Sequence, residues 1–158
     1  MTDKQSKVGT FCKNNLNSNA WSPNVSRTSA DGKITFDSGM YKCNLFVYEA
    51  LTSAGVKVPV YNKGGKLFPP NTEEWYNEKV EGFKLVGKGI NALNKCWPGD
   101  VIVLYTTTLF GLIKTNHHMG IITGPQKTCS AAGDSIIIND YGWRTGQWTE
   151  VKIFRYPS

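Results

Sequence analysis

A cysteine and a histidine that lie far apart in the chain could together perform thiol-based amide hydrolysis. Cys43 stands at the start of an apolar stretch, and His118 immediately precedes Met119 and Gly120. A cysteine nucleophile needs an imidazole within hydrogen-bond reach to take its proton, and the imidazole needs a polar group that orients it. We therefore predict Cys43 as the nucleophile and His118 as the general base.

A helix must position Cys43, because the apolar residues after it recur at helical spacing until Gly55, which provides a stop. The residues that share the face of Cys43 and turn it into a core are Val47, Ala50, Leu51 and Ala54. Free N–H groups and the positive dipole end at a helix start stabilise a thiolate and can lower a cysteine pKa below about 8.5. The alternative is that Cys43 is simply a small buried apolar residue.

A strand must position His118. The turn at residues 97–100 leads into a strand over residues 100–105, and a second strand over residues 119–123 begins directly after His118. Because neighbouring side chains alternate on a strand, His117 points to the opposite face, toward a groove or toward solvent. The two histidines are therefore predicted to differ in role.

The remaining elements give an α+β layout, in which helices come first and an antiparallel sheet follows with the Cys43 helix packed on it. We predict an extended segment at 33–36, a helix over 72–77, a strand at 82–86, a helical turn within 89–95, and strands over Ser135–Asn139 and Glu150–Arg155. Residues 1–10 are polar and predicted to be flexible. Residues 106–116 are predicted to form a long loop that lines a substrate groove or covers a sheet edge.

Further residues could contact a substrate. The backbone N–H of Cys43 is a candidate oxyanion donor, and the side chain of Tyr41 or Lys42 could supply another. His117 could line the groove, and Trp143 could stack on sugar rings. These four side chains are our candidate substrate-binding residues.

The composition indicates one soluble globular domain over residues 1–158. No apolar run approaches the roughly 20 residues of a membrane span, and no apolar segment of a signal peptide follows the N-terminus. We therefore expect no membrane insertion, and export by another machine or from a processed precursor if the protein acts outside the cell. The net charge of +6 comes from scattered residues, which argues against nucleic-acid binding and suits either an anionic polymer such as a bacterial wall or plain solubility.

The spacing of the cysteines predicts no metal and no cofactor. Cys12, Cys43, Cys96 and Cys129 form no C-x-x-C pair, so a structural zinc site is not expected. With Cys43 as a free nucleophile, at most one disulfide can form among the other three, and the sequence leaves the pair open.

The ordered motifs resemble those of the papain-like NlpC and CHAP peptidoglycan hydrolases. Residues 42–48, the pair Pro69-Pro70 ahead of Trp75, and residues 138–144 are similar to the second family of type VI secretion amidase effectors, over roughly residues 38–150. Two departures are the doubled histidine and Tyr141, which stands where tryptophan is expected.

The resemblance implies a papain-like fold and a third catalytic residue near the end of the strand that follows the histidine strand. The position that matches the CHAP pattern is Asp140, and Asn139 is the alternative because an amide can also fix an imidazole tautomer. Either residue could instead serve only the turn ahead of Gly142.

The implied function is a cysteine amidase that cuts peptide cross-links of bacterial peptidoglycan near the D-alanine–diaminopimelate bond. Such a protein would be a monomeric antibacterial effector toxin, delivered to the periplasm of a target cell and neutralised in the producer by a cognate immunity protein. The alternatives are a phage or autolytic endopeptidase with another bond specificity, and a non-catalytic wall-binding module on the same scaffold.

Overall fold

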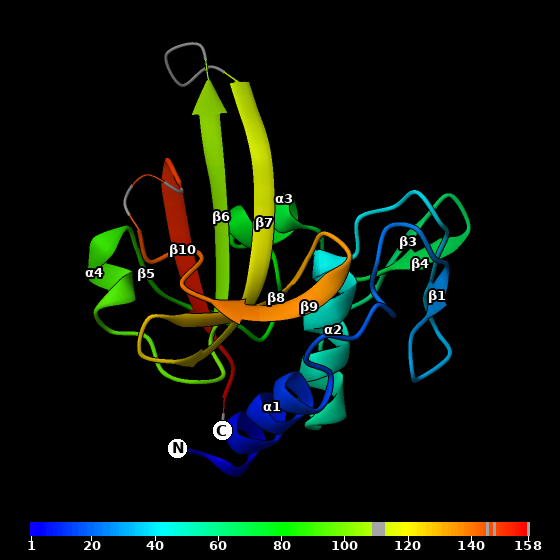
Figure 1. Cartoon of the computed structure of the whole chain (residues 1–158), viewed down its shortest axis with the longest axis horizontal. Helices are drawn as coiled ribbons and strands as arrows, with labels where there is room; N and C mark the ends of the chain where they lie inside the picture. The colour runs from blue at the N-terminus through cyan, green and yellow to red at the C-terminus, as the bar shows by residue number, and fades with distance from the viewer. Residues whose placement is uncertain (109–112, 145, 147, 158) are drawn as a thin grey trace.

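The computed structural model describes residues 1–108, 113–144, 146 and 148–157. It contains a six-stranded antiparallel sheet with the strand order β5-β10-β6-β7-β8-β9, and helices pack against it (Figure 1). The predicted α+β class is confirmed. Within the described residues, no helix combines the length and the apolar character needed to cross a membrane.

The sheet is a four-stranded meander extended on one side. The meander consists of β6 (Val101–Thr108), β7 (Ile113–Gly124), β8 (Lys127–Ala132) and β9 (Ser135–Asn139). After β9 the chain returns, so that β10 (Glu150–Arg155) pairs with β6, and β5 (Lys84–Lys88) pairs with the outer side of β10. The position of β10 between β5 and β6 depends on pairing between distant segments.

Both faces of the central strands are buried, which explains the unbroken apolar run at the start of β6. Val101 and Val103 face the main core, whereas Ile102 and Leu104 face a second cluster. That cluster is covered by α4 (Ile90–Leu93) and by aromatic residues that follow β9. Each face of β6 therefore has its own apolar partner layer.

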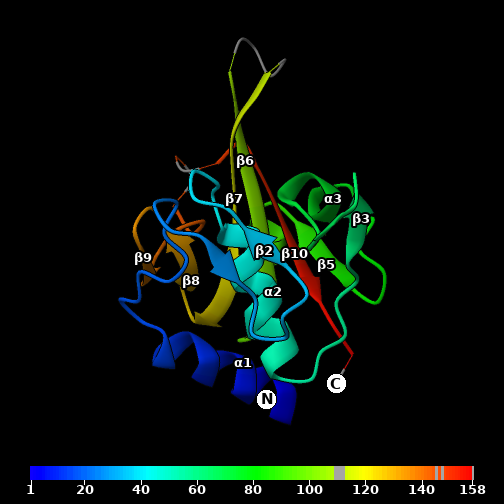
Figure 2. The same cartoon turned by 90° about the vertical axis from the view of Figure 1, so that its right-hand side faces the viewer.

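Helix α2 (Cys43–Ser53) is the central helix of the main core. Every residue from Leu45 to Leu51 is buried, and the helix contacts β7 and β8 (Figure 2). It ends as predicted, with Gly55 in the left-handed region at φ 79°. The buried carboxylate of Glu49 accepts hydrogen bonds from the Trp21 indole at 2.7 Å and from Arg27 at 2.7 and 2.8 Å, so a charge inside the core is paired.

Residues 1–10, which the sequence predicts to be flexible, lie for the most part in α1 (Asp3–Asn14), which begins with a capping box between Thr2 and Gln5. Val8 and Cys12 are fully buried against α2 and the sheet, so one face of this polar segment is anchored. The N-terminal cap and the spaced apolar residues favour a helix here, although the composition of the segment is polar.

The sheet also differs from the prediction at two places. Residues 106–108 and 113–116 are not loop but extend β6 and β7 as a paired hairpin, because Thr106–Thr108 find cross-strand partners on β7. The remainder of the predicted loop, residues 109–112, lies outside the described residues. Strand β8 was not predicted, because its small and polar residues gain strand structure from pairing with β7 and β9.

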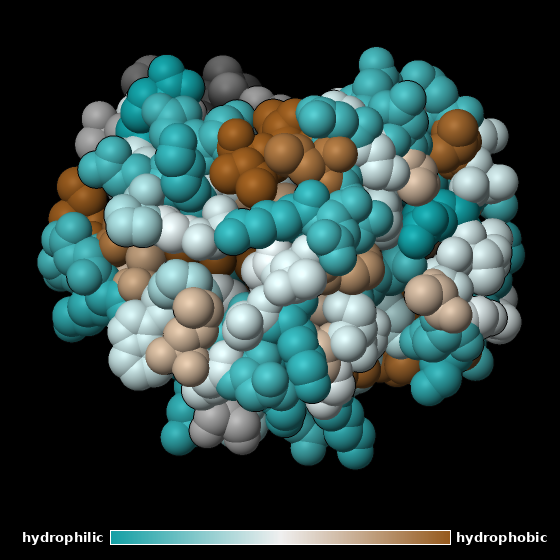
Figure 3. Space-filling view, turned by 60° about the horizontal axis from the view of Figure 1, so that its bottom comes forward, coloured by the Kyte–Doolittle hydropathy of each residue, from teal (hydrophilic) through white to brown (hydrophobic). Residues whose placement is uncertain are grey.

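Short elements surround the α2 side of the sheet. They are β1 (Arg27–Thr28), β2 (Thr35–Phe36), β3 (Tyr61–Lys63), β4 (Lys66–Phe68) and α3 (Thr72–Tyr76). The predicted segment at 33–36 and helix at 72–77 are confirmed, the latter with a capping box between Asn71 and Glu74. The surface seen in Figure 3 is mostly hydrophilic, with hydrophobic atoms gathered in separate areas.

Candidate active site

Cys43 is the first residue of α2 and lies beside the backbone of β7. Burial raises the pKa of the Cys43 thiol above its ordinary value, because desolvation outweighs the opposing effect of the nearby backbone N–H groups of Met119, Asn44 and Cys43 itself. The helix start therefore supplies anion-stabilising donors, but the resting group is a neutral thiol that needs a base.

Lys42 holds the chain that leads into this helix. Its side chain is only 2% exposed, and Nζ donates to the carbonyl oxygens of Ser22 at 3.0 Å, Asp37 at 3.2 Å and Met40 at 2.8 Å. All three ammonium donors are thus used inside the protein. The prediction of Lys42 as a substrate or oxyanion contact does not fit this placement, and the residue instead fixes the backbone ahead of Cys43.

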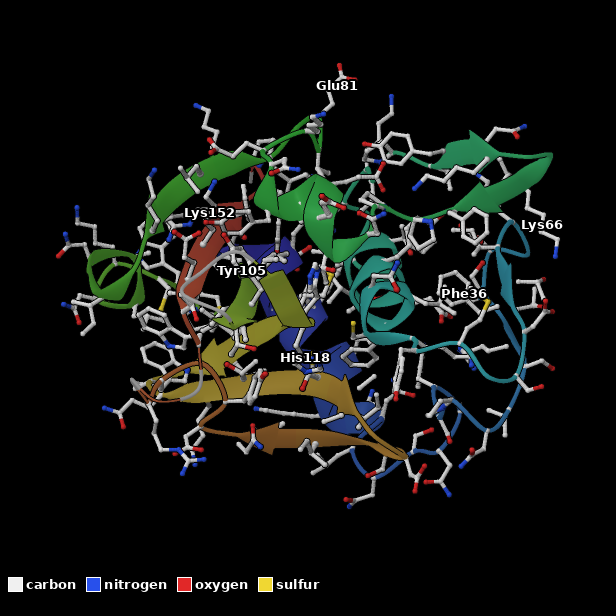
Figure 4. The ribbon with its side chains drawn as sticks, turned by 90° about the horizontal axis from the view of Figure 1, so that it is seen from above. Phe36, Lys66, Glu81, Tyr105, His118 and Lys152 are labelled. Carbon is white, nitrogen blue, oxygen red and sulfur yellow. The ribbon has the colours of Figure 1, made fainter. Side chains whose placement is uncertain are left out.

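His118 lies on β7 opposite Leu104, and its half-buried ring packs edge-on against the ring of Tyr141 with centroids 4.9 Å apart. Burial lowers the pKa of His118 to about 4. The imidazole is therefore neutral at pH 7, which is the state in which it can accept a proton from a thiol. In the view from above, His118 lies beside β7 and β8, toward α2 (Figure 4).

His117 has different surroundings, as the alternation along a strand predicts. It pairs with Tyr105 across the sheet and is exposed, with its ring 6.0 Å from that of Tyr105. Its Nδ1 lies 3.3 Å from the hydroxyl of Thr72 on α3. The two histidines thus face different neighbours.

A surface cavity of about 610 Å³ brings most of the predicted site residues together. The predicted residues that line it are Tyr41, Cys43, His117, His118 and Asn139, joined by Thr106, Ser130–Gly133 and Tyr141. Tyr41 is 79% exposed, so it is placed at the surface where it could meet a large substrate. Cys43 and His118, the predicted nucleophile and base, therefore share one solvent-accessible space.

The two candidates for the third residue are placed differently. Asn139 lines the cavity, and its Oδ1 accepts the backbone N–H of Tyr141 at 3.1 Å. Asp140 is not among the lining residues, and its exposed carboxylate pairs with Arg144 at 3.1 Å. In the part of the chain that the structure describes, neither side chain is hydrogen-bonded to His118.

Trp143 lies away from the cavity. Its indole N–H donates to the Thr128 hydroxyl at 3.3 Å, and its ring packs against the second apolar cluster. It lines a separate cavity of about 250 Å³ together with Cys96. This placement supports the second apolar cluster, so Trp143, predicted to stack on sugar rings, does not line the cavity that contains Cys43.

Tyr141 and Ser130 are among the cavity residues that sequence reasoning did not name. The ring of Tyr141 contacts His118, and the nearby Cys43 is one of the groups that raise the pKa of the Tyr141 hydroxyl. Ser130 lies on β8 with a fully buried hydroxyl. The aromatic residue after Asn139 and Asp140 was a visible signal for Tyr141, whereas Ser130 carried none because its strand was not predicted.

The arrangement has the parts of a thiol-dependent acyl transfer site. A neutral thiol, a neutral imidazole and backbone N–H donors share one cavity. Among the residues that the structure describes, no group of three or more His, Cys, Asp or Glu side chains is arranged to hold a metal ion. Neither a protein-family model nor a curated protein sequence matches the chain.

Proposed function

We propose that this chain is a papain-like cysteine amidase that hydrolyses peptide cross-links of bacterial peptidoglycan. The observation that carries the proposal is the shared cavity, which both Cys43 at the start of α2 and His118 on β7 line. A helix that presents a cysteine to an antiparallel sheet bearing the histidine is also what a papain-like fold requires. The resemblance of the motifs supplies the substrate class.

In the proposed reaction, the Cys43 sulfur attacks the amide carbonyl carbon while the thiol proton passes to His118. The tetrahedral intermediate collapses, and the imidazolium gives its proton to the leaving amine, so that a thioester on Cys43 remains. His118 then takes a proton from water, which attacks the thioester, releases the carboxylate and restores the thiol. The backbone N–H of Cys43 at the start of α2 is the proposed donor for the developing oxyanion.

The wider role follows from the resemblance. We propose an antibacterial effector toxin that acts in the periplasm of a target cell after delivery by a type VI apparatus, with a cognate immunity protein in the producer. The net charge of +6 supports attraction to an anionic wall. Binding to whole sacculi should then weaken as added salt screens the charge.

Digestion of purified sacculi, followed by mass spectrometry of the released muropeptides, tests the proposal. We expect wild type and Cys96→Ala to convert cross-linked dimers into monomers, because Cys96 lies outside the cavity, whereas Cys43→Ala should release none. Near wild-type release by Cys43→Ala would refute the assignment of the nucleophile. Cleavage within the stem peptide would instead identify an endopeptidase of another specificity, and binding without cleavage by wild type would identify a wall-binding module.

A further inference from the structure

The hydroxyl of Ser130 is a buried polar group that the proposed reaction does not yet use. Ser130 is 1% exposed, and its Oγ has no hydrogen-bond partner among the described residues. Buried hydroxyls are normally paired, because leaving one unpaired destabilises the fold. Ser130 also lines the cavity that contains Cys43 and His118, so its hydroxyl is placed where function could explain its lack of a partner.

The register of the sheet places Ser130 close to the imidazole. Ile121 of β7 pairs with Cys129 of β8, so Gly120 and Ser130 are the next pair along. A Cβ added at Gly120 would lie 3.0 Å from the Cβ of Ser130, which confirms that the two residues are neighbours. His118 is two residues before Gly120 on the same face, roughly 7 Å along the strand, and diagonal pairs at this separation lie within reach of aromatic side chains.

Gly120 allows the backbone of β8 to pack closely against β7 at this pair. A methyl group there would lie 2.6 Å from the Cys129 carbonyl oxygen and 2.8 Å from a Thr128 methyl carbon, so no side chain fits. Position 120 therefore contributes no side chain between His118 and Ser130 on this face of the sheet.

His118 needs a partner of this kind. A base that takes a proton on one ring nitrogen is held in the right tautomer by a hydrogen bond from the other nitrogen. The side-chain oxygen of Asn139 already accepts the Tyr141 N–H, and the Asp140 carboxylate is paired with Arg144. A serine hydroxyl can accept an imidazole N–H, and it adds no charge beside the ring.

We propose that Ser130 is the positioning residue for His118, and that a rotation of either side chain brings the Ser130 hydroxyl, unpaired in this structure, to the ring N–H of His118 that faces away from Cys43. This inference rests on the proposed pairing of Cys43 and His118. The bond fixes the tautomer that leaves the other ring nitrogen free to take the thiol proton. Because the hydroxyl is uncharged, it orients the ring without stabilising the imidazolium as a carboxylate would.

Nitrogen NMR of the histidine rings tests the contact without any substrate. The parent is Cys43→Ala, and Ser130→Ala is added to it, while Ser135→Ala on the neighbouring strand β9 is the matched control. The chain has two histidines, so His117 serves as an internal reference. We expect one dominant His118 tautomer in the parent and in the Ser135 variant, and averaged ring signals after Ser130→Ala. Unchanged His118 signals after Ser130→Ala would overturn the proposal.

Kinetics on a purified cross-linked muropeptide dimer test whether the Ser130 hydroxyl contributes to the rate of catalysis. Ser130→Ala should lower kcat about tenfold with KM little changed, and Ser130→Thr should recover most of this loss because it restores the hydroxyl. A folded Ser130→Thr protein that is no faster than Ser130→Ala would overturn the proposal.

Alkylation of Cys43 by iodoacetamide provides a rate that does not depend on the substrate. It should slow in Ser130→Ala and recover in Ser130→Thr, since both reactions need the oriented imidazole. An alkylation rate that Ser130→Ala leaves unchanged would count against the contact. If the NMR and alkylation results hold while wild type cleaves no muropeptide, the positioning role stands and the proposed substrate is refuted.

Discussion

The half-buried imidazole of His118 should make the stability of this protein sensitive to mild acid. Burial lowers the pKa of His118 from 6.5 to about 4, so between these pH values the unfolded state binds a proton that the folded state excludes. The contribution of His118 to stability is therefore complete above pH 6.5 and declines as the pH falls toward 4. Below about pH 4 both states are protonated and no further loss arises from this residue.

The amount by which burial lowers the pKa of His118 sets the amount of stability lost in acid. The difference between 6.5 and about 4 is 2.5 pKa units, which at 1.36 kcal/mol per unit is an upper value of about 3 kcal/mol. Because water reaches part of the ring, we expect a loss of about 1 to 3 kcal/mol between pH 7 and pH 4. Asp31 and Glu78 also have lowered pKa values, so acid lability of the wild type alone would not identify His118.

Urea unfolding at several pH values between 7 and 4 measures the effect as a difference between variants. His118→Gln keeps a polar side chain that does not titrate, so its free energy of unfolding should fall less with pH than that of wild type. His117→Gln is the matched control, because His117 is exposed, and it should follow wild type. If wild type and His118→Gln lose stability in parallel over this range, His118 is not buried in its neutral form and the reasoning fails.

Four further outcomes follow from the site. In His118→Ala, alkylation of Cys43 should accelerate about tenfold per pH unit between pH 6 and 8, since burial holds the thiol pKa above the ordinary value and no imidazole takes the proton, and a pH-independent rate would indicate a resting thiolate. His118→Ala should lower muropeptide hydrolysis by several orders of magnitude, and a loss below about tenfold would remove it as the base. Asp140→Ala should stay within about threefold of wild type, because its exposed carboxylate pairs with Arg144, whereas a hundredfold loss would restore Asp140 as the orienting group. Lys42→Met should lower the free energy of unfolding by about 2 kcal/mol or more by leaving three carbonyl oxygens without their donor, and an unchanged urea midpoint would contradict this.

The sequence alone determined the elements whose signals are local. The helix from Cys43 is visible because its apolar residues repeat at 3.6-residue spacing and Gly55 ends it. The short helix after Asn71 is visible through its cap, and the start of β6 through its run of β-branched and apolar residues. Cys43 and His118 could be singled out as candidates for the same reason, since each stands at the beginning of, or within, a segment with a strong pattern of its own.

Only the tertiary structure decided the features that depend on distant partners. Strand β8 consists of small and polar residues that become a strand by pairing with β7 and β9, so Ser130 could not be placed in advance. Lys42 looks like a surface residue in the sequence, but three carbonyl oxygens from separate positions enclose its ammonium group. Asn139 and Asp140 are neighbours with similar turn propensity, and only the packing of the chain after β9 turns one toward the cavity and leaves the other with Arg144. Local propensity is enough to form a helix or a strand. Burial, strand pairing and the placement of a third site residue depend instead on contacts between segments that are distant in the sequence.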